Sequence, residues 1–144
     1  MFDELTKYKN SGHFFFSIND NLKDVCNAPT NKGGIYIVYA LKDGQIDGST
    51  LVVQEKLNRT AHFFIREAGL GGLKDRLVNG KQFGSPRRNS WKTRVQDEGI
   101  EALDIYWYAT HDENFIDCPR ILENKLLQKH QRIFRRLPRW NNEL

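Results

Sequence analysis

The sequence predicts an α/β fold of the α+β type, with a small, mostly antiparallel central sheet flanked by helices. Two segments rich in β-branched and aromatic residues have the composition of strands. Between these two segments, apolar residues recur at helical spacing. A long amphipathic helical pattern lies near the end of the chain. With 144 residues, of which 39% are hydrophobic, the chain suffices for one domain that spans residues 1–144.

The N-terminal part predicts one strand and one short helix. Residues 1–13 are expected to form a short helix or a flexible arm. The three phenylalanines of residues 14–16 predict a strand or a buried patch. Asn19 and Asp20 then predict a cap for a helix over residues 21–26.

The middle of the chain predicts a hairpin followed by two helices. A strand over residues 35–40 follows two glycines, and residues 50–54 predict its partner beyond a turn. Residues 60–68 and 72–78 then place apolar side chains at helical spacing. The sheet is therefore expected to contain two neighbouring antiparallel strands at this point.

The C-terminal part predicts another helix, a second clear strand and the long helix. Ser90 is expected to cap a helix that runs to Gln96, and residues 103–109 predict the strand. Asp117 is expected to cap the long helix, with Pro119 in its first turn. The apolar side of that helix is predicted to comprise Leu122, Leu126, Leu127, His130, Ile133, Phe134 and Leu137.

The composition argues against several classes of protein. No apolar run approaches the length that crosses a bilayer, and the first four residues carry acids where a signal peptide carries cations. We therefore expect a cytoplasmic protein without a membrane partner. Cys26 and Cys118 lie far apart and the four histidines are scattered. Both thiols are accordingly predicted to be reduced, and no structural zinc site is expected.

The positive charge of the chain is clustered. The net charge is +4 and the pI is about 9.1. Residues 81–94 hold five cations and no acid, and residues 120–139 hold seven cations and one acid, Glu123. Clustered cations create a positive field that a polyanion can use. Two solvated basic faces explain the same pattern, so charge alone leaves both interpretations open.

Several short motifs occur together in a specific order, although none of them is informative alone. They are Gly34-Ile35-Tyr36, Gly71 to Leu77, Leu122 to Leu127 and Leu137 to Asn141, with further likeness at Val25 to Pro29, Val78 to Gly84 and Ile105 to Tyr108. On these motifs the chain resembles the GIY-YIG nuclease family, in particular its compact bacterial and phage-type members. The resemblance covers roughly residues 14–144.

This resemblance implies a metal-dependent DNA endonuclease that hydrolyses phosphodiester bonds. Tyr36 matches the family's general base, whose phenol must lose its proton more easily than usual to activate a water molecule. Arg76 matches the arginine that clamps the scissile phosphate. Glu123 matches the ligand of a single Mg²⁺ or Mn²⁺ ion per active site. Asn141 matches an asparagine that helps to arrange the site in some members.

Each of these residues also has a structural interpretation. Tyr36 fits a strand tyrosine half-buried in the core, and Arg76 fits an ordinary cation on a helix surface. Glu123 shares the inward side of its helix with His130, where a carboxylate needs a neutralising partner. An ion pair with Arg120 is the alternative to a metal ion.

The resemblance makes DNA the expected partner, with double-stranded DNA preferred. Cations expected to contact its backbone are Lys81, Arg87, Arg88, Lys92 and Arg94. Trp91, which lies among them, is expected to anchor a helix in the core rather than to stack on a base. A homodimer or a protein partner is left open.

The second half of the family's motif is missing. By order it falls on residues 51–56, and a later placement on residues 64–66 implies a long insertion in the hairpin. Neither placement supplies a tyrosine hydroxyl. Gly80 and Lys81 also stand where the family often has histidine or tyrosine. The alternative function is therefore a catalytically inactive GIY-YIG-fold protein that binds DNA or a protein partner.

Overall fold

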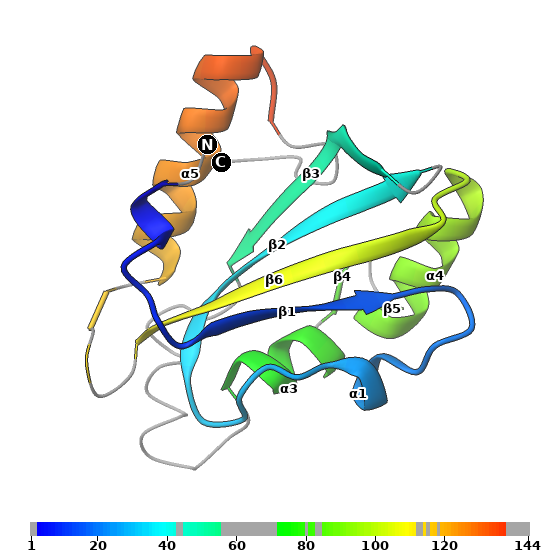
Figure 1. Ribbon diagram of the computed structural model, residues 1–144, viewed down its shortest axis with the longest axis horizontal. Helices are drawn as coiled ribbons and strands as arrows, with labels where there is room; N and C mark the ends of the chain where they lie inside the picture. The colour runs from blue at the N-terminus through cyan, green and yellow to red at the C-terminus, as the bar shows by residue number, and fades with distance from the viewer. Residues whose placement is uncertain are drawn as a thin grey trace.

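A four-stranded antiparallel sheet forms the centre of the molecule (Figure 1). The computed structural model describes residues 3–42, 45–55, 72–79, 81–82, 85–111, 114, 116–117 and 119–137. The strands are β1 (Ser11–Phe16), β2 (Gly33–Lys42), β3 (Gln45–Glu55) and β6 (Ala102–His111), in the order β1-β6-β2-β3. All three neighbouring pairs are antiparallel. The expected fold class is thus confirmed.

Helices cover both faces of the sheet. One face packs against α1 (Leu22–Val25), α3 (Gly72–Asn79) and α4 (Arg87–Asp97), and we call it the α3 face. The other packs against α5 (Pro119–Phe134) and the short 3-10 helix η1 (Asp3–Leu5), and we call it the α5 face. The two-residue strands β4 (Lys81–Gln82) and β5 (Ser85–Pro86) pair with each other ahead of α4.

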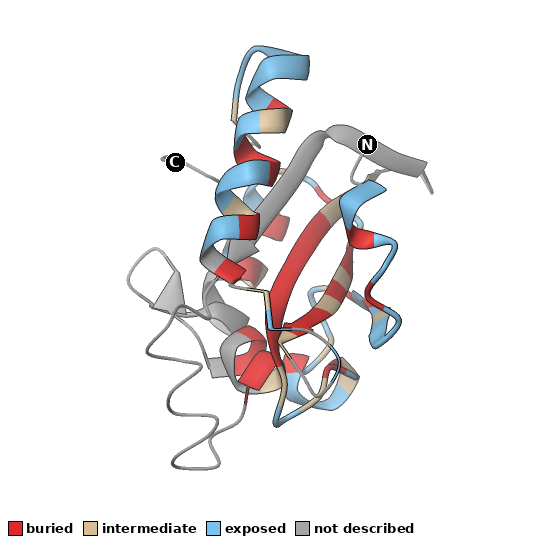
Figure 2. Ribbon diagram, turned by 90° about the vertical axis from the view of Figure 1, so that its left-hand side faces the viewer, coloured by how far each residue is buried: buried red, intermediate tan, exposed pale blue. Residues whose placement is uncertain are grey.

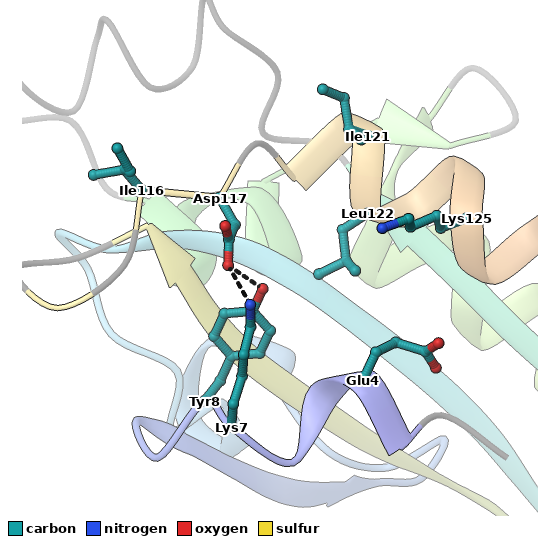
Figure 3. Close-up of a pocket in the computed structure, with 8 residues that line it drawn as sticks. All are labelled: Glu4, Lys7, Tyr8, Ile116, Asp117, Ile121, Leu122 and Lys125. Carbon is teal, nitrogen blue, oxygen red and sulfur yellow. Dashed lines mark hydrogen bonds and ion pairs between the residues drawn. The ribbon is translucent and has the colours of Figure 1, made fainter.

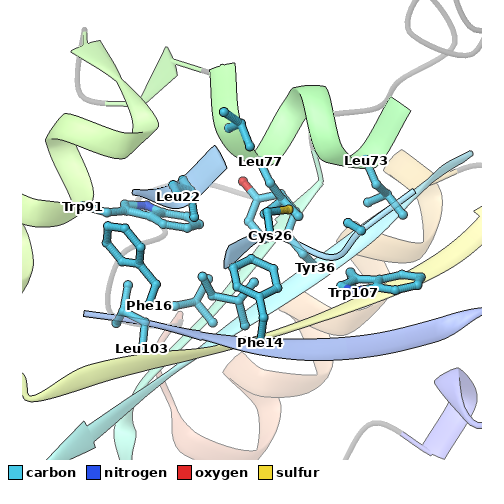
Figure 4. Packing of buried hydrophobic residues seen from close by; sticks show 14 of the residues in the cluster. Phe14, Phe16, Leu22, Cys26, Tyr36, Leu73, Leu77, Trp91, Leu103 and Trp107 are labelled. Atoms are coloured by element: carbon cyan, nitrogen blue, oxygen red, sulfur yellow. The ribbon is translucent and has the colours of Figure 1, made fainter. Parts of the chain in front are cut away.

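The α3 face carries the larger apolar core. Successive side chains of a strand point to opposite faces, so Tyr36 and Val38 of β2 belong to this core. Trp91 of α4 is its largest fully buried side chain. Figure 4 shows Trp91 beside Phe16 and Leu22, with α3 supplying Leu73 and Leu77 above Tyr36.

The α5 face carries a second, smaller apolar core. Ile35 and Ile37 of β2 meet the inward side of α5 and η1, which contribute Leu5, Leu122, Leu126 and Leu127. Figure 2 shows this buried stripe along α5. Two residues of the expected stripe lie outside this core, whereas Leu137 packs against it. Ile133 and Phe134 are 51% and 46% exposed, so the last turn of α5 lacks the cover that the first three turns receive.

Gly34 is required by a close approach of two strands. The pairing of β2 with β6 is irregular between Gly33 and Gly34. A Cβ atom on Gly34 would lie 1.9 Å from the carbonyl oxygen of Tyr108 on β6. Because that neighbour is backbone, a larger residue would have to push the two central strands apart. The first letter of the Gly34-Ile35-Tyr36 motif therefore has a structural explanation.

The N-terminal segment belongs to the folded domain. The strand predicted at residues 14–16 is confirmed as β1, which pairs with β6 as a fourth strand. The described part of the segment, residues 3–13, contains η1 and the start of β1, with Leu5 and Tyr8 buried. Sequence alone left a flexible arm open here because only two apolar side chains of this segment enter the core.

Other predicted elements are confirmed with different ends. The strand expected at residues 50–54 is the end of a longer strand, β3. The helix expected from Ser90 begins at Arg87 instead. Asn21, rather than Asn19 or Asp20, caps α1 by accepting a hydrogen bond from the Lys23 amide. The helix expected over residues 60–68 lies outside the described residues.

Candidate active site and nucleic-acid surface

Tyr36 lies inside the core of the α3 face. Its side chain has no exposed surface. Its ring packs edge-on against Trp91, with the ring centroids 6.2 Å apart at an interplanar angle of 66°. A general base must reach the water molecule that it activates, and a phenol closed off from solvent does not meet this condition in the observed conformation. The sequence prediction of a half-buried tyrosine understated the burial.

Arg76 lies in the middle of α3, a helix that docks on the segment ahead of β2. The Leu73 amide donates to the Lys32 carbonyl at 2.9 Å, and the Lys74 amide donates to the Pro29 carbonyl at 2.9 Å. Gly72 adopts a φ of 57°, and a Cβ atom there would meet the Lys32 carbonyl oxygen at 2.6 Å. The turn into α3 thus requires glycine. The side chain of Arg76 is outside the described atoms.

Glu123 lies on the inward side of α5, one turn from Leu126 and Leu127. Its carboxylate is partly buried, and its Oε2 atom is shut off from solvent. The lone acid of this basic segment is therefore turned away from the solvent face of α5. Its expected ion-pair partner, Arg120, has no described side chain.

Tyr36 and Glu123 extend from opposite faces of the sheet. Tyr36 belongs to the core beneath α3 and α4. The neighbours of Glu123 along α5, Leu122 and Leu126, belong to the core of the α5 face. The structure therefore does not place the phenol and the carboxylate together in one open cleft. Tyr36 does share its face with α3, the helix of Arg76.

The other predicted contacts are only partly described. Lys92 is half-buried on α4, and Arg94 lies 3.8 Å from the carboxylate of Glu98 one turn later. Trp91 is fully buried, which confirms its role as a core anchor. Side chains that are not described are those of Lys81, Arg87 and Arg88, and Asn141 lies outside the described residues.

Sequence analysis missed a polar cluster between η1 and the start of α5. The Tyr8 hydroxyl donates to Asp117 Oδ2 at 2.5 Å, and Lys7 Nζ lies 3.1 Å from the same atom. These two contacts lower the pKa of Asp117, whereas burial raises the pKa of Tyr8. The Asp117 carboxylate, which was expected to cap α5, therefore contacts Lys7 and Tyr8 of the N-terminal segment. In the sequence, Tyr8 was the residue that could have indicated this contact.

This cluster forms one wall of a surface cavity of about 450 Å³. Figure 3 shows the paired side chains of Lys7, Tyr8 and Asp117 on one side and Ile121, Leu122 and Lys125 of α5 on the other. Ile121 is largely exposed at the rim. The cavity combines apolar surface with charges of both signs.

A second missed cluster lies on the α5 face beyond the reach of α5. His13 Nδ1 lies 2.9 Å from Asp104 Oδ1. His13 stacks on Tyr106 with ring centroids 4.7 Å apart. Burial raises the pKa of the neighbouring Tyr39 to about 12. These phenols remain neutral near pH 7. The Asp104 carboxylate is almost fully buried and has His13 as a partner on the neighbouring strand.

Within the described residues, no group of three or more His, Cys, Asp or Glu side chains is placed to hold a metal ion. Likewise, none of the helices in this part of the chain is long and apolar enough to cross a lipid bilayer. The buried thiol of Cys26 is free, as expected, and burial raises its pKa. No family model, curated protein or solved structure matches the chain.

Proposed function

We propose that the chain is a metal-dependent DNA endonuclease of the GIY-YIG type. The observation that carries this proposal is the order of the elements. A hairpin with Gly34-Ile35-Tyr36 on its first strand leads to α3 with Arg76, then to strand β6, and finally to α5 with Glu123. The order of the elements and the three residue types support the proposal together, although a fold alone does not establish a function.

Glu123 fits a magnesium or manganese ion. Mg²⁺ keeps several water molecules and is commonly bound by one or two carboxylates together with phosphate oxygens. A single, partly buried carboxylate satisfies this requirement without a cluster of protein ligands. When bound, the ion would supply a Lewis acid for the phosphate and an activated water molecule. Arg76 would bind the phosphate, because its planar guanidinium offers several donors.

A second candidate function is DNA binding without cleavage. The burial of Tyr36 favours it, because a sealed phenol does not exchange a proton with water. The missing second tyrosine of the motif favours it too. In this case the basic surface of the chain retains its partner, and the metal site has no catalytic role.

A plasmid-nicking assay with metal binding as a second readout distinguishes the two functions. Supercoiled plasmid is incubated with the purified protein and Mg²⁺ or Mn²⁺, beside Glu123→Gln and Tyr36→Phe. Glu123→Gln keeps the shape of the side chain and removes its charge. Tyr36→Phe keeps the buried ring and removes the hydroxyl. An endonuclease nicks the plasmid, and Glu123→Gln loses this activity together with Mn²⁺ binding, measured by calorimetry.

The outcome for Tyr36→Phe decides the role of the phenol. Full activity in this variant shows that Tyr36 serves only in core packing. A loss of activity without a loss of stability supports Tyr36 as the general base. Nicking that survives in Glu123→Gln contradicts the proposed metal site. Salt-sensitive DNA binding without any nicking establishes the second function instead.

A further inference from the structure

The solvent face of α5 and its C-terminal end form a basic surface. Exposed cations on it are Lys125, Arg132, Arg135 and Arg136, and we call these four residues the basic face. Their exposed neighbours Asn124, Gln128 and Gln131 are uncharged. Glu123, the only acid of the helix, is partly buried on the inward side. The basic face therefore contains no acid.

Two cations of the basic face, Lys125 and Arg132, lie on one line along the helix. Lys125 and Arg132 are seven residues apart, which corresponds to two turns and about 10 Å along the axis. Arg135 and Arg136 follow directly after α5, where the chain is fixed by two hydrogen bonds. The Arg135 amide donates to the Gln131 carbonyl at 2.8 Å, and buried His130 donates from Nδ1 to the Arg136 carbonyl at 2.8 Å.

The hydrogen bonds and ion pairs of two nearby acids, Glu4 and Asp117, are with residues outside the basic face. Glu4 lies 3.3 Å from Lys129, which is outside the basic face. Asp117 interacts with Lys125 only through its field, because its hydrogen-bonded partners are Tyr8 and Lys7. A polyanion would supply the complementary charge along this face.

Among polyanions, a nucleic-acid backbone fits better than a membrane surface. A helix that binds a membrane inserts a continuous apolar side. In α5 the middle of that side is buried against Ile35 and Ile37, and the exposed Ile121, Ile133 and Phe134 lie at the two ends of the helix. A line of cations instead needs only a line of phosphates. The helix α4 packs on the opposite face of the sheet from α5.

We propose that the basic face of α5 docks on the phosphate backbone of DNA. The inference rests on DNA being the partner in the proposed function, but it does not require cleavage. The proposal assigns the main contact surface to α5 rather than to the cations of residues 81–94. The charge pattern alone favoured both segments equally. Contacts of this kind give affinity and salt dependence without sequence choice.

The test compares charge-neutralising variants of the full chain. Arg132→Gln and the double variant Lys125→Gln/Arg132→Gln remove charge from the basic face. Lys23→Gln, an exposed lysine of α1 on the opposite side of the sheet, is the matched control. Binding of a short duplex is measured by fluorescence anisotropy at several salt concentrations without divalent metal, and circular dichroism confirms that each variant is folded.

We expect the double variant to bind at least about tenfold more weakly at low salt. The slope of log K against log salt concentration should fall by about 0.9 for each lost phosphate contact. Lys23→Gln should bind as the unchanged protein does. Equal binding by the double variant and the control overturns the proposal. Preferential binding to phosphatidylserine vesicles, lost in the double variant while DNA binding persists, overturns it as well.

Failure of this inference is distinguishable from failure of the proposed function. Glu123-dependent nicking with normal DNA binding by the α5 variants leaves the endonuclease and removes the docking surface. Salt-sensitive binding that depends on α5, with no nicking in Mg²⁺ or Mn²⁺, leaves the docking surface and removes the endonuclease.

Discussion

The two faces of the sheet differ in what they leave open. The α3 face is sealed by three helices, and its core includes Tyr36 and Trp91 without exposed surface. The α5 face is covered by α5 and the short helix η1 over part of its area. It keeps the pair of His13 and Asp104 outside that cover, with the His13 side chain 46% exposed. Of these described residues, the accessible polar pair therefore lies on the α5 face, whereas Tyr36 points to the α3 face.

Side chains of a single strand, β2, enter both cores. Along β2, Tyr36 turns to the α3 face and its neighbours Ile35 and Ile37 turn to the α5 face. Tyr36, which matches a residue of the nuclease motif, is thus buried in the apolar core of the α3 face. The first-strand tyrosine contributes a large aromatic surface to the core, whatever its role in chemistry.

The largest expected effect concerns the sealed face. Trp91→Ala removes the largest fully buried side chain and should lower the free energy of unfolding by about 3–5 kcal/mol. Phe15→Ala is the matched control on the α5 face, because Phe15 is 53% exposed. It should cost well under about 1 kcal/mol. Urea denaturation measures both, and similar losses in the two variants would contradict the contrast between the faces.

An intermediate effect is expected at the open end of the α5 face. His13→Ala removes the His13 partner of the almost fully buried Asp104 carboxylate. We expect a loss of about 1–2 kcal/mol in the free energy of unfolding. Combining His13→Ala with Asp104→Asn should recover part of the loss. Strictly additive effects in this double-mutant cycle would show that the pair is not coupled.

The smallest effect is a pH dependence beneath α5. Burial lowers the pKa of His130 from its ordinary value of 6.5, against the opposing hydrogen bond to the Arg136 carbonyl. The unfolded chain therefore takes up a proton at a higher pH than the folded protein does. Stability should be independent of this group above about pH 6.5 and should fall as the pH drops below that value. His130→Asn should have a shallower fall in urea midpoint, and an unchanged slope would rule out the assignment.

Local pattern in the sequence determined most of the secondary structure. Runs of β-branched and aromatic residues predicted the strands that became β2 and β6, because such side chains suit a pleated, buried surface. Helical spacing and Pro119 predicted α5, and glycine at positions 34 and 72 marked points where a Cβ atom does not fit. The charge clusters and the three motif residues were also readable from the sequence.

Tertiary contacts decided the rest, since they join residues that lie far apart in the chain. The capture of Asp117 by Tyr8 spans 109 positions, and the pairing of His13 with Asp104 spans 91. No local pattern contains either contact. The extent of each core also depended on tertiary contacts, because Ile133 and Phe134 at the end of α5 are exposed although Leu137 beyond them packs against the smaller core. Alternation along β2 fixed that Tyr36 and Ile35 face opposite ways, but only the packing of helices decided which face would be closed.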